Sequence, residues 1–412
     1  PAVFQRFSGF SPFSPPLLLC TKKKDRFLII SVVTAWSDKR KDVENSMKII
    51  CEKQALLDAV NAVGRAVSAK SAYPALEGIL VRASGSILFL AGYDMELGIT
   101  THIEAEVKEP GEIVLTARLF GDIVRRLPGD EVELTSDDKM NVYIKSGMSD
   151  FHIMGIASAE YPELPTVDEG TGFAVPQKLL RSMIRQTIFA VSQNDSRPVH
   201  KGILFELNGN QLRLVAVDGS RLALRCEQIK NTEELRFVIP GKTLQEVMKL
   251  LSDEDTPVSL AVGRRHVVME IDGYAVISRL LEGEFLSYQK AIPQEAGTTV
   301  RVKTRDLIDA VERASLIISD YVKSPLICRF EEGEIRLSCN TAMGSSNDVL
   351  PAEIQGESEE IGFNSRFMLD ALKNTECDEV RIEIKGALSP MKILPPEGEE
   401  FLFLVLPVRL KR

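Results

Sequence analysis

Histidine is scarce in this sequence of 412 residues, and the four copies lie far apart on strand-like segments: His102, His152, His200 and His266. None of them shows the spacing of metal ligands or of a helical H-E-x-x-H motif. The six cysteines are also scattered and lack C-x-x-C spacing. That distribution favours reduced structural thiols in a cytosolic compartment over a disulfide framework or a zinc site. We therefore expect no metal and no cofactor.

Catalytic motifs are missing as well. The sequence contains no G-x-S-x-G elbow, no G-x-x-x-x-G-K-[ST] phosphate loop and no dinucleotide fingerprint. Adjacent acids such as Glu399 and Glu400 occur without residues that imply a pocket around them. No run reaches the roughly 18 apolar residues of a membrane span, and 44% apolar with 26% charged residues is an ordinary soluble composition. We expect a soluble, cytoplasmic, non-catalytic protein.

The first 46 residues differ in composition from the rest. Pro1 is not an initiator residue, Pro, Ser and Phe are clustered near it, and Met47 resembles the true start. The apolar stretch 27–36 is too short to span a bilayer and lacks a small-residue cleavage site, which argues against a secretory signal. We interpret residues 1–46 as a disordered extension or translated upstream sequence. An organelle transit peptide is the open alternative, because residues 1–21 contain no acid.

Two patterns recur along the chain at a fixed period. Three copies of a strand-helix pattern lie 124 residues apart, at 113–127, 237–251 and 361–375. A hairpin pattern has a clear second copy and a weaker third, at 78–94, 202–218 and 325–341. The period far exceeds the roughly 20 to 50 residues of solenoid repeats, so each copy is a whole domain with its own core. We predict an extension and three tandem domains, at 1–46, 47–168, 171–294 and 297–412.

Each domain is itself duplicated. The segment 49–60 has the same short strand and amphipathic helix as 113–124, which gives six strand-helix units in the chain. Between these units, apolar and polar residues alternate over short runs joined by turn residues, a pattern typical of antiparallel hairpins. Helices are expected to start near Lys53, Thr116, Pro176, Gly241, Thr304 and Ser365. The expected fold class is α+β, with two helices packed on antiparallel sheet in each domain.

Three short motifs complete the pattern: AVDGSRLA at 216–223, IGFN at 361–364 and LPVRL at 406–410. Together with the duplicated domains, they make residues 47–412 resemble the bacterial beta sliding clamp, the beta subunit of DNA polymerase III. The resemblance implies a DNA clamp fold and a head-to-tail homodimeric ring, with helices lining the hole and antiparallel sheets outside. It also implies a non-catalytic processivity factor that slides on duplex DNA without sequence specificity and tethers DNA polymerase subunits, the clamp loader and repair proteins.

The net charge of −9 is compatible with DNA binding only if the basic residues are segregated. The expected helix at 177–192 carries three bases and no acid, whereas acidic runs such as 253–255 fall in turn-like segments. With the family as a guide, the expected DNA contacts are Lys70, Arg125, Arg126, Arg181, Arg185, Asn194 and Arg197. The alternative is that these are ordinary solvated helix faces and turn residues. A protein-binding adaptor without DNA is a second alternative, in which basic residues would be scattered over all faces.

The resemblance also implies a dimer contact and a partner-peptide groove. The dimer would join Phe151 and Ile153 of one subunit to Ile317 and Ile318 of the other. Met148 and Asp150 stand near this contact where a compared family member has arginines, which puts its charged part in doubt.

The groove would lie between the second and third domains. Its expected residues are His200, Val217, Gly219, Ser220, Arg221, Leu222, Pro293, Asn364, Phe367, Leu388, Pro390, Leu404, Leu406, Val408 and Arg409. The alternative for Leu404, Leu406 and Val408 is a place on the inward face of a terminal strand. Ser220 replaces a histidine of the family, and Lys411 and Arg412 extend past its usual end.

Overall fold

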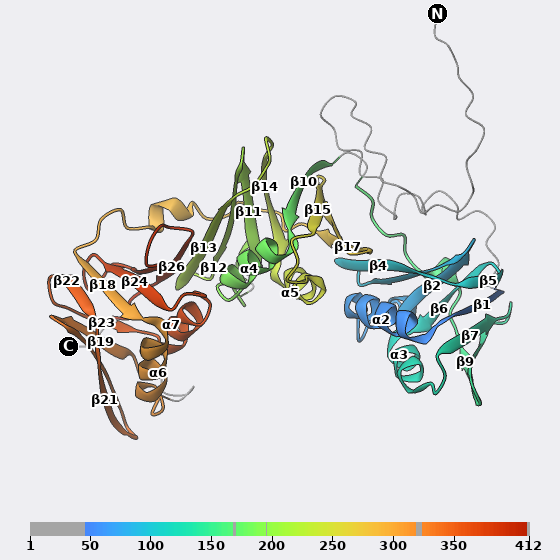
Figure 1. Ribbon diagram of the computed structural model, residues 1–412, viewed down its shortest axis with the longest axis horizontal. Helices are drawn as coiled ribbons and strands as arrows, with labels where there is room; N and C mark the ends of the chain where they lie inside the picture. The colour runs from blue at the N-terminus through green and yellow to red at the C-terminus, as the bar shows by residue number, and fades with distance from the viewer. Residues whose placement is uncertain (1–45, 168–169, 195, 319–323, 410–412) are drawn as a thin grey trace, which may run out of the picture.

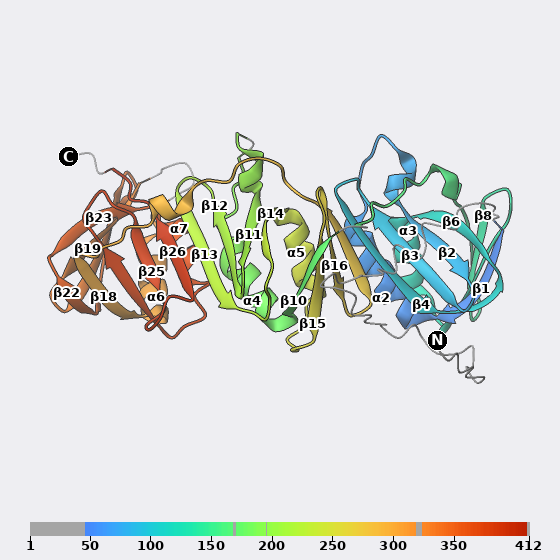
Figure 2. The ribbon, with the colours of Figure 1, turned by 90° about the horizontal axis from the view of Figure 1, so that it is seen from above.

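The computed structural model describes residues 46–167, 170–194, 196–318 and 324–409, which form a curved arc of three units (Figure 1). Helices line the concave side of the arc, and the sheets form its outer layer (Figures 1 and 2). The extension expected at 1–46 lies outside the described residues, apart from Ser46, and the first strand begins at Met47.

The first unit contains two halves, each with a strand, a helix and further strands. Its first half consists of β1 (Met47–Glu52), α2 (Lys53–Val63), β2 (Gly78–Ser84), β3 (Ile87–Tyr93) and β4 (Leu97–Glu104). Its second half consists of β5 (Glu106–Glu109), β6 (Gly111–Thr116), α3 (Ala117–Arg126), β7 (Glu131–Ser136), β8 (Asn141–Ser146) and β9 (Ser149–Met154). Short 3-10 turns are η1 (Gly64–Ala66), η2 (Pro74–Glu77) and η3 (Ser158–Glu160).

The other two units repeat this order. The second consists of β10 (Thr171–Pro176), α4 (Gln177–Ile188), η4 (Pro198–Lys201), β11 (Gly202–Asn208), β12 (Gln211–Val217), β13 (Arg221–Gln228), β14 (Glu234–Pro240), α5 (Gly241–Leu250), β15 (Pro257–Val262), β16 (His266–Ile271), β17 (Tyr274–Arg279) and η5 (Tyr288–Ala291). The third consists of β18 (Thr298–Lys303), α6 (Thr304–Ala314), β19 (Leu326–Glu331), β20 (Glu334–Thr341), β21 (Gly344–Pro351), β22 (Glu353–Gly356), β23 (Glu359–Phe363), α7 (Ser365–Leu372), β24 (Glu379–Ile384), β25 (Met391–Leu394) and β26 (Phe401–Val405).

The helices form because apolar residues recur on one face of each. In α4, Leu180, Met183 and Ile184 are buried at the i, i+3 and i+4 positions, and they pack into the core beneath the sheets. Two helices are capped by side chains: Glu52 accepts from two backbone N–H groups at the start of α2, and Asn364 accepts from Arg366 N at the start of α7. The buried face of each helix therefore rests on the sheets, and its polar face is turned to the concave side.

Two of the four sheets formed by the described residues continue from one unit into the next. Strand β17 of the second unit pairs with β4 of the first, and β26 of the third unit pairs with β13 of the second. In both junctions the last strand of one unit is antiparallel to the fourth strand of the first half of the unit before it. The outer layer is therefore joined by backbone hydrogen bonds across both unit boundaries.

The chain leaves each unit along the same path. After the last strand of each unit, the backbone hydrogen-bonds to one strand of its own unit: Ile156 to Val114, Leu281 to Val238, and Val408 to Gly362. In the first two units the following segment then covers the outer sheet face, where Tyr161 and Tyr288 are buried in small apolar clusters. The third unit has polar residues such as Ser338 and Asn340 at the matching outer positions, so it does not need this cover.

The structure confirms the α+β class, the duplicated units and the helix starts, each within a residue of its expected position. The domain limits at 168, 171, 294 and 297 stay a prediction, because strand pairing joins the units across them. One element differs from expectation: His200 lies in the 3-10 turn η4 and not in a strand, because Pro198 sets the backbone there.

An ion pair occupies the same cross-strand position on the outer face of each unit. The pairs are Arg82 with Glu112, Arg236 with Glu206, and Arg329 with Glu360, and the central pair has its charges exchanged between the strands. The first pair is the most buried, with side-chain exposures of 7% and 9%. Removal of one partner in a buried pair leaves the other charge uncompensated.

We therefore expect Arg82→Ala to destabilise the first unit by about 3 kcal/mol, whereas Arg82→Leu combined with Glu112→Leu should be close to neutral. Urea unfolding of the full chain measures both. Equal losses for the single and the double variant would contradict this account of the pair.

Candidate nucleic-acid interface and partner groove

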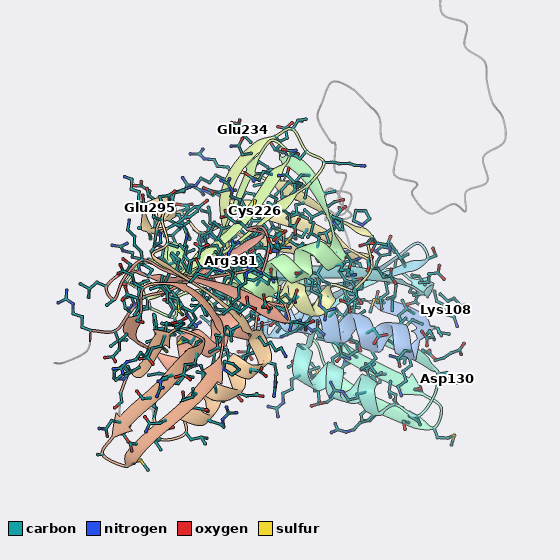
Figure 3. All side chains as sticks on the ribbon, turned by 60° about the vertical axis from the view of Figure 1, so that its left-hand side comes forward. Lys108, Asp130, Cys226, Glu234, Glu295 and Arg381 are labelled. Atoms are coloured by element: carbon teal, nitrogen blue, oxygen red, sulfur yellow. The ribbon has the colours of Figure 1, made fainter. Side chains whose placement is uncertain are left out.

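Positive charge on the concave side is concentrated on two helices. Helix α4 carries Lys178, Arg181 and Arg185 with no acid, and α3 carries three arginines with Asp122 alone opposing them. By contrast, α6 carries two bases and three acids. Acidic residues also lie on the outer layer, where Figure 3 shows Glu234 and Glu295 on the side away from the helices. A protein with a net negative charge can bind DNA only if its basic residues are gathered on one surface, and these two helices meet that condition.

Each of the four helix arginines expected to contact DNA also contacts a carboxylate. Arg125 and Arg126 both face Asp122, with N–O distances of 2.9 and 3.9 Å. Arg181 pairs with Asp253 at 2.7 Å, in the turn after α5. Arg185 pairs across the unit boundary with Glu376 at 3.1 Å, in the turn after α7.

The three loop residues expected to contact DNA are exposed. Lys70 follows α2, and Asn194 and Arg197 follow α4 at the corresponding place of the second unit. Local hydrogen bonds shape both loops: Ser68 Oγ donates to Lys70 O at 2.9 Å, and Ser196 N donates to Asn194 Oδ1 at 3.0 Å. The loops project from the same edge of the arc (Figure 2). The structure thus brings them to one rim of the concave surface.

Arg221 lies at the centre of the expected partner groove. Its guanidinium pairs with Asp218 in the preceding turn at 2.8 Å and with Asp370 of α7 at 2.5 Å, so it connects the second and third units. Its Cζ atom lies 4.5 Å from the centre of the Phe367 ring. Two carboxylates and the rings of Phe367 and Phe189 therefore fix its orientation.

The chain after β26 lies along one side of the expected groove. Leu406 N donates to Ser220 O at 2.9 Å, and Val408 N donates to Gly362 O at 2.8 Å, so this segment crosses from the second unit to the third. Leu406 and Val408 expose 38% and 39% of their surface, and Leu388 exposes 82%. These apolar side chains are open to a partner, and Leu406 and Val408 are not an inward strand face.

Beneath the expected groove lies the outer apolar cluster of the 9-stranded sheet. Val217, Leu222 and Leu404 are buried there, so for Leu404 the inward-strand interpretation holds. The His200 ring packs edge-on against the ring of Phe285. Burial, and to a smaller extent the positive charge of Arg197, lowers the pKa of His200 and so favours the neutral imidazole.

The remaining expected groove residues lie around this cluster. Pro293 follows Ile292, which packs on the cluster, and Pro390 directly precedes β25. Gly219, Asn364 and Arg409 are exposed at the rim.

Sequence reasoning did not single out several residues that contact those of the expected groove. Asp370 and Phe189, which hold Arg221, are distant from it in the chain, and no local pattern marks them. Phe285 and Tyr288 of the connecting segment are buried in the same apolar cluster as Val217 and Leu222. The three-residue spacing of these two aromatic residues, in a segment rich in turn residues, is the sequence signal that could have identified them.

The expected dimer residues lie at the two ends of the arc. Phe151 and Ile153 are on β9, and Ile317 and Ile318 follow α6, where both are partly buried against the core. The neighbouring Leu316, which sequence reasoning did not single out, exposes 83% of its surface. The two pairs do not touch within one chain, as expected for a contact between two copies.

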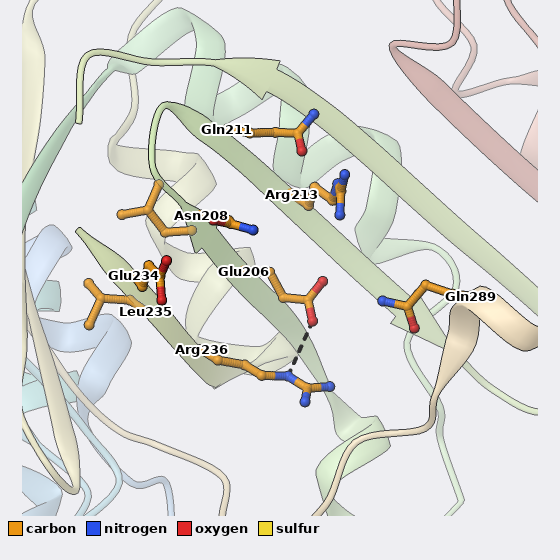
Figure 4. Close-up of a pocket in the computed structure, with 9 residues that line it drawn as sticks. Glu206, Asn208, Gln211, Arg213, Glu234, Leu235, Arg236 and Gln289 are labelled. Carbon is orange, nitrogen blue, oxygen red and sulfur yellow. Dashed lines mark ion pairs between the residues drawn. The ribbon is translucent and has the colours of Figure 1, made fainter. Parts of the chain in front are cut away.

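A separate polar hollow of about 390 Å³ lies on the outer face of the second unit (Figure 4). It is lined by Glu206, Leu207, Asn208, Gln211, Arg213, Glu234, Leu235, Arg236 and Gln289. Arg236 pairs with Glu206 at 3.2 Å, and Tyr288 donates to the same carboxylate. Burial and this carboxylate raise the pKa of Tyr288, so the phenol stays protonated. Its charged groups oppose one another, and none belongs to the expected site.

Within the described ranges, no group of His, Cys, Asp and Glu side chains has the geometry of a metal site. The five cysteines of these ranges are unpaired, and burial raises the pKa of Cys51 and Cys328 to about 12. None of the helices in the described part of the chain is long and apolar enough to cross a bilayer.

Comparison with known proteins agrees with the geometry. Three family models match in tandem: the N-terminal, central and C-terminal domains of the DNA polymerase III beta subunit, at residues 47–165, 174–286 and 289–409. The chain belongs to the DNA polymerase III beta subunit family. Its fold is therefore the clamp fold, and its role is that of a non-catalytic sliding clamp.

Individual relatives cover nearly the whole chain. The beta sliding clamp of Bacillus subtilis is 34% identical over 376 residues, which is 88% of this chain and 100% of the relative. The crystal structure of the Bacillus subtilis sliding clamp superposes with a TM-score of 0.87 at 33% identity, over 89% of this chain and 100% of that chain. A Pseudomonas aeruginosa sliding clamp bound to griselimycin has a TM-score of 0.84 at 27% identity, over 89% and 100%.

Proposed function

We propose that two copies of this chain close head to tail into a ring of six domains around duplex DNA in the cytoplasm. Through the groove between the second and third units, the ring holds DNA polymerase subunits, the clamp loader and repair proteins on that DNA. The observation that carries this proposal is the pairing rule of the two internal junctions, β4 with β17 and β13 with β26. The same rule applied to the ends of the chain leaves β21 and β9 as the remaining pair.

These two strands are free edges in the described structure. Among the eight edges of the four sheets, six belong to strands where the two halves of one unit meet, and β9 and β21 lie at the outer ends. A contact between β21 of one chain and β9 of another is heterologous, and it closes when the curvature of two chains completes a circle. Pairing would also cover two exposed edges that otherwise invite aggregation.

The internal junctions also supply the expected register. Leu97, Arg221 and Gly344 are the first residues of β4, β13 and β21, the fourth strand of each first half, and the first two pair with Ser278 and Val405. The residue of β9 that corresponds to Ser278 is Ile153. Gly344 is therefore expected opposite Ile153 of the second chain.

Side-chain packing supports the same arrangement. At the junction of the second and third units, Phe403 contacts Phe189, with ring centres 5.1 Å apart. Phe151 on β9 corresponds to Phe403, and Leu316 after α6 corresponds to Phe189. Both are exposed in one chain, at 37% and 83%. Ring closure would place Phe151 on Leu316 and the adjacent Ile317.

The charge distribution favours DNA over the adaptor alternative. Basic side chains converge on the concave helices α3 and α4 and on the two loops at one rim, while acids such as Glu234 and Glu295 lie on the outer layer. Lys and Arg contacts to phosphate carry no base information, which suits a ring that moves along any sequence. The polar and apolar groups of the groove suit a short extended peptide, since exposed leucines give affinity and Arg221 and Asn364 fix direction.

A ring holds DNA by linkage, so it should stay on nicked circular duplex and run off linear duplex. We expect loaded protein to co-elute with circular DNA at moderate salt and to be lost from the same DNA after linearisation. Blocking both ends of the linear DNA with bound protein should restore retention. Equal retention on open linear and circular DNA would rule out encirclement.

A further inference from the structure

Four of the five arginines on α3 and α4 do not face the central space as free cations. These four, Arg125, Arg126, Arg181 and Arg185, have carboxylate oxygens within 4 Å. Guanidinium groups bind carboxylate and phosphate with the same planar geometry, so a carboxylate in this position competes with a DNA phosphate for the same donors.

The competing acids come from three separate places in the fold. Asp122 lies one turn before its partners on α3, Asp253 lies in the turn after α5, and Glu376 lies in the turn after α7 of the next unit. Glu376 also accepts from Ser182 Oγ at 3.0 Å and has a φ of +58°, a conformation that is unfavourable for a residue with a side chain. The backbone thus holds this carboxylate against α4 at some cost.

These pairs contribute little to the stability of the fold. Their arginine side chains expose between 41% and 73% of their surface, and the Asp253 side chain exposes 82%. Exposed pairs of this kind are weak, because water screens the charges and both side chains lose freedom. A phosphate oxygen can therefore replace a carboxylate without unfolding anything.

We propose that Asp122, Asp253 and Glu376 limit the grip of the ring on DNA. The three carboxylates neutralise the arginine charges while no DNA phosphate is bound. Each phosphate must therefore displace a carboxylate to bind an arginine, and it is released when the carboxylate returns. The affinity then stays low enough for the ring to move freely while linkage prevents escape. This inference rests on the proposed encirclement of DNA.

The test replaces the three acids with their isosteric amides, as D122N, D253N and E376Q together. The matched control is E133Q, E360Q and E397Q, which removes the same charge from acids paired with Lys48, Arg329 and Arg301. Both full-length variants and the wild type are loaded on circular DNA, and their one-dimensional diffusion is then followed on stretched duplex with blocked ends.

We expect the first variant to diffuse roughly three- to tenfold more slowly than the wild type and the control to match the wild type. Its binding to a short duplex without loading should also depend more steeply on salt, by about 0.9 in the log–log slope for each freed cation that gains a phosphate. Unchanged or faster diffusion with an unchanged salt slope would overturn the inference. Loss of the wild type from circular DNA would instead overturn the encirclement on which it rests.

Discussion

Replacing Ile317 with Ala and Ile318 with Lys is expected to convert the protein from a dimer to a monomer. Both side chains follow α6 and are partly buried beside Leu316, at the end of the arc that carries β21. A lysine in this apolar contact would lose its hydration without gaining a partner, which typically costs several kcal/mol. That penalty corresponds to a loss of roughly a thousandfold or more in dimer affinity.

Light scattering at micromolar concentration measures the mass directly. Because Ile317 and Ile318 also touch the core of their own unit, a second variant, Leu316→Lys, separates association from folding, since Leu316 is 83% exposed in one chain. Leu286→Lys, which changes a partly exposed leucine of the connecting segment, is the control and should stay dimeric. A dimeric mass for both end variants would remove this surface from the interface.

The double variant Leu222→Ala and Leu406→Ala is expected to abolish measurable binding of a labelled polymerase C-terminal peptide. Leu406 is exposed beside the proposed groove, and Leu222 is buried beneath it in the same cluster as Val217 and Leu404. If the peptide covers about 80 Å² of Leu406 at roughly 25 cal/mol per Å², that truncation costs about 2 kcal/mol, and truncation of the buried Leu222 leaves a cavity under the contact that costs about 2 kcal/mol more. The affinity would then fall by about three orders of magnitude.

Fluorescence polarisation of the labelled peptide measures this loss, with light scattering to verify that the dimer is intact. Leu222 is almost fully buried, so its truncation also costs stability, and the single variant Leu406→Ala isolates the effect of the groove. Its affinity should fall by about thirtyfold. Tyr73→Ala, a change at an exposed residue of the first unit, should bind like the wild type. Unchanged affinity in the folded Leu406→Ala and double variants would move the partner site elsewhere.

Local sequence patterns were sufficient to predict the repeated architecture. The strand-helix copies at 113–127, 237–251 and 361–375 became β6 with α3, β14 with α5, and β23 with α7. Apolar spacing and turn residues determine such elements within a few positions of the chain, so they can be read without tertiary information. The concentration of basic residues on α3 and α4 was visible for the same reason.

Contacts between distant segments could not be predicted in this way. Arg185 meets Glu376 and Arg221 meets Asp370, 191 and 149 residues further along the chain, and each pairing depends on how two units dock. Leu316 follows a helix, and no local pattern marks it as exposed. Its exposure follows from the structure, because no further unit of the same chain covers that end of the arc. The membership of individual residues in the DNA and partner sites stays a prediction until the variants are measured.

The path of the chain between units also bears on how such a ring would open under load. At the junctions of β4 with β17 and of β13 with β26, the two units are also joined by the connecting segment of the chain, which crosses the outer sheet face. Separation of the paired strands therefore also requires exposure of the buried tyrosines of that segment. The contact between β21 and β9 of two chains has no such strap. Mechanical failure of the ring would therefore begin at that seam, and a genetic fusion of two copies, with a linker across one seam, would leave a single gate.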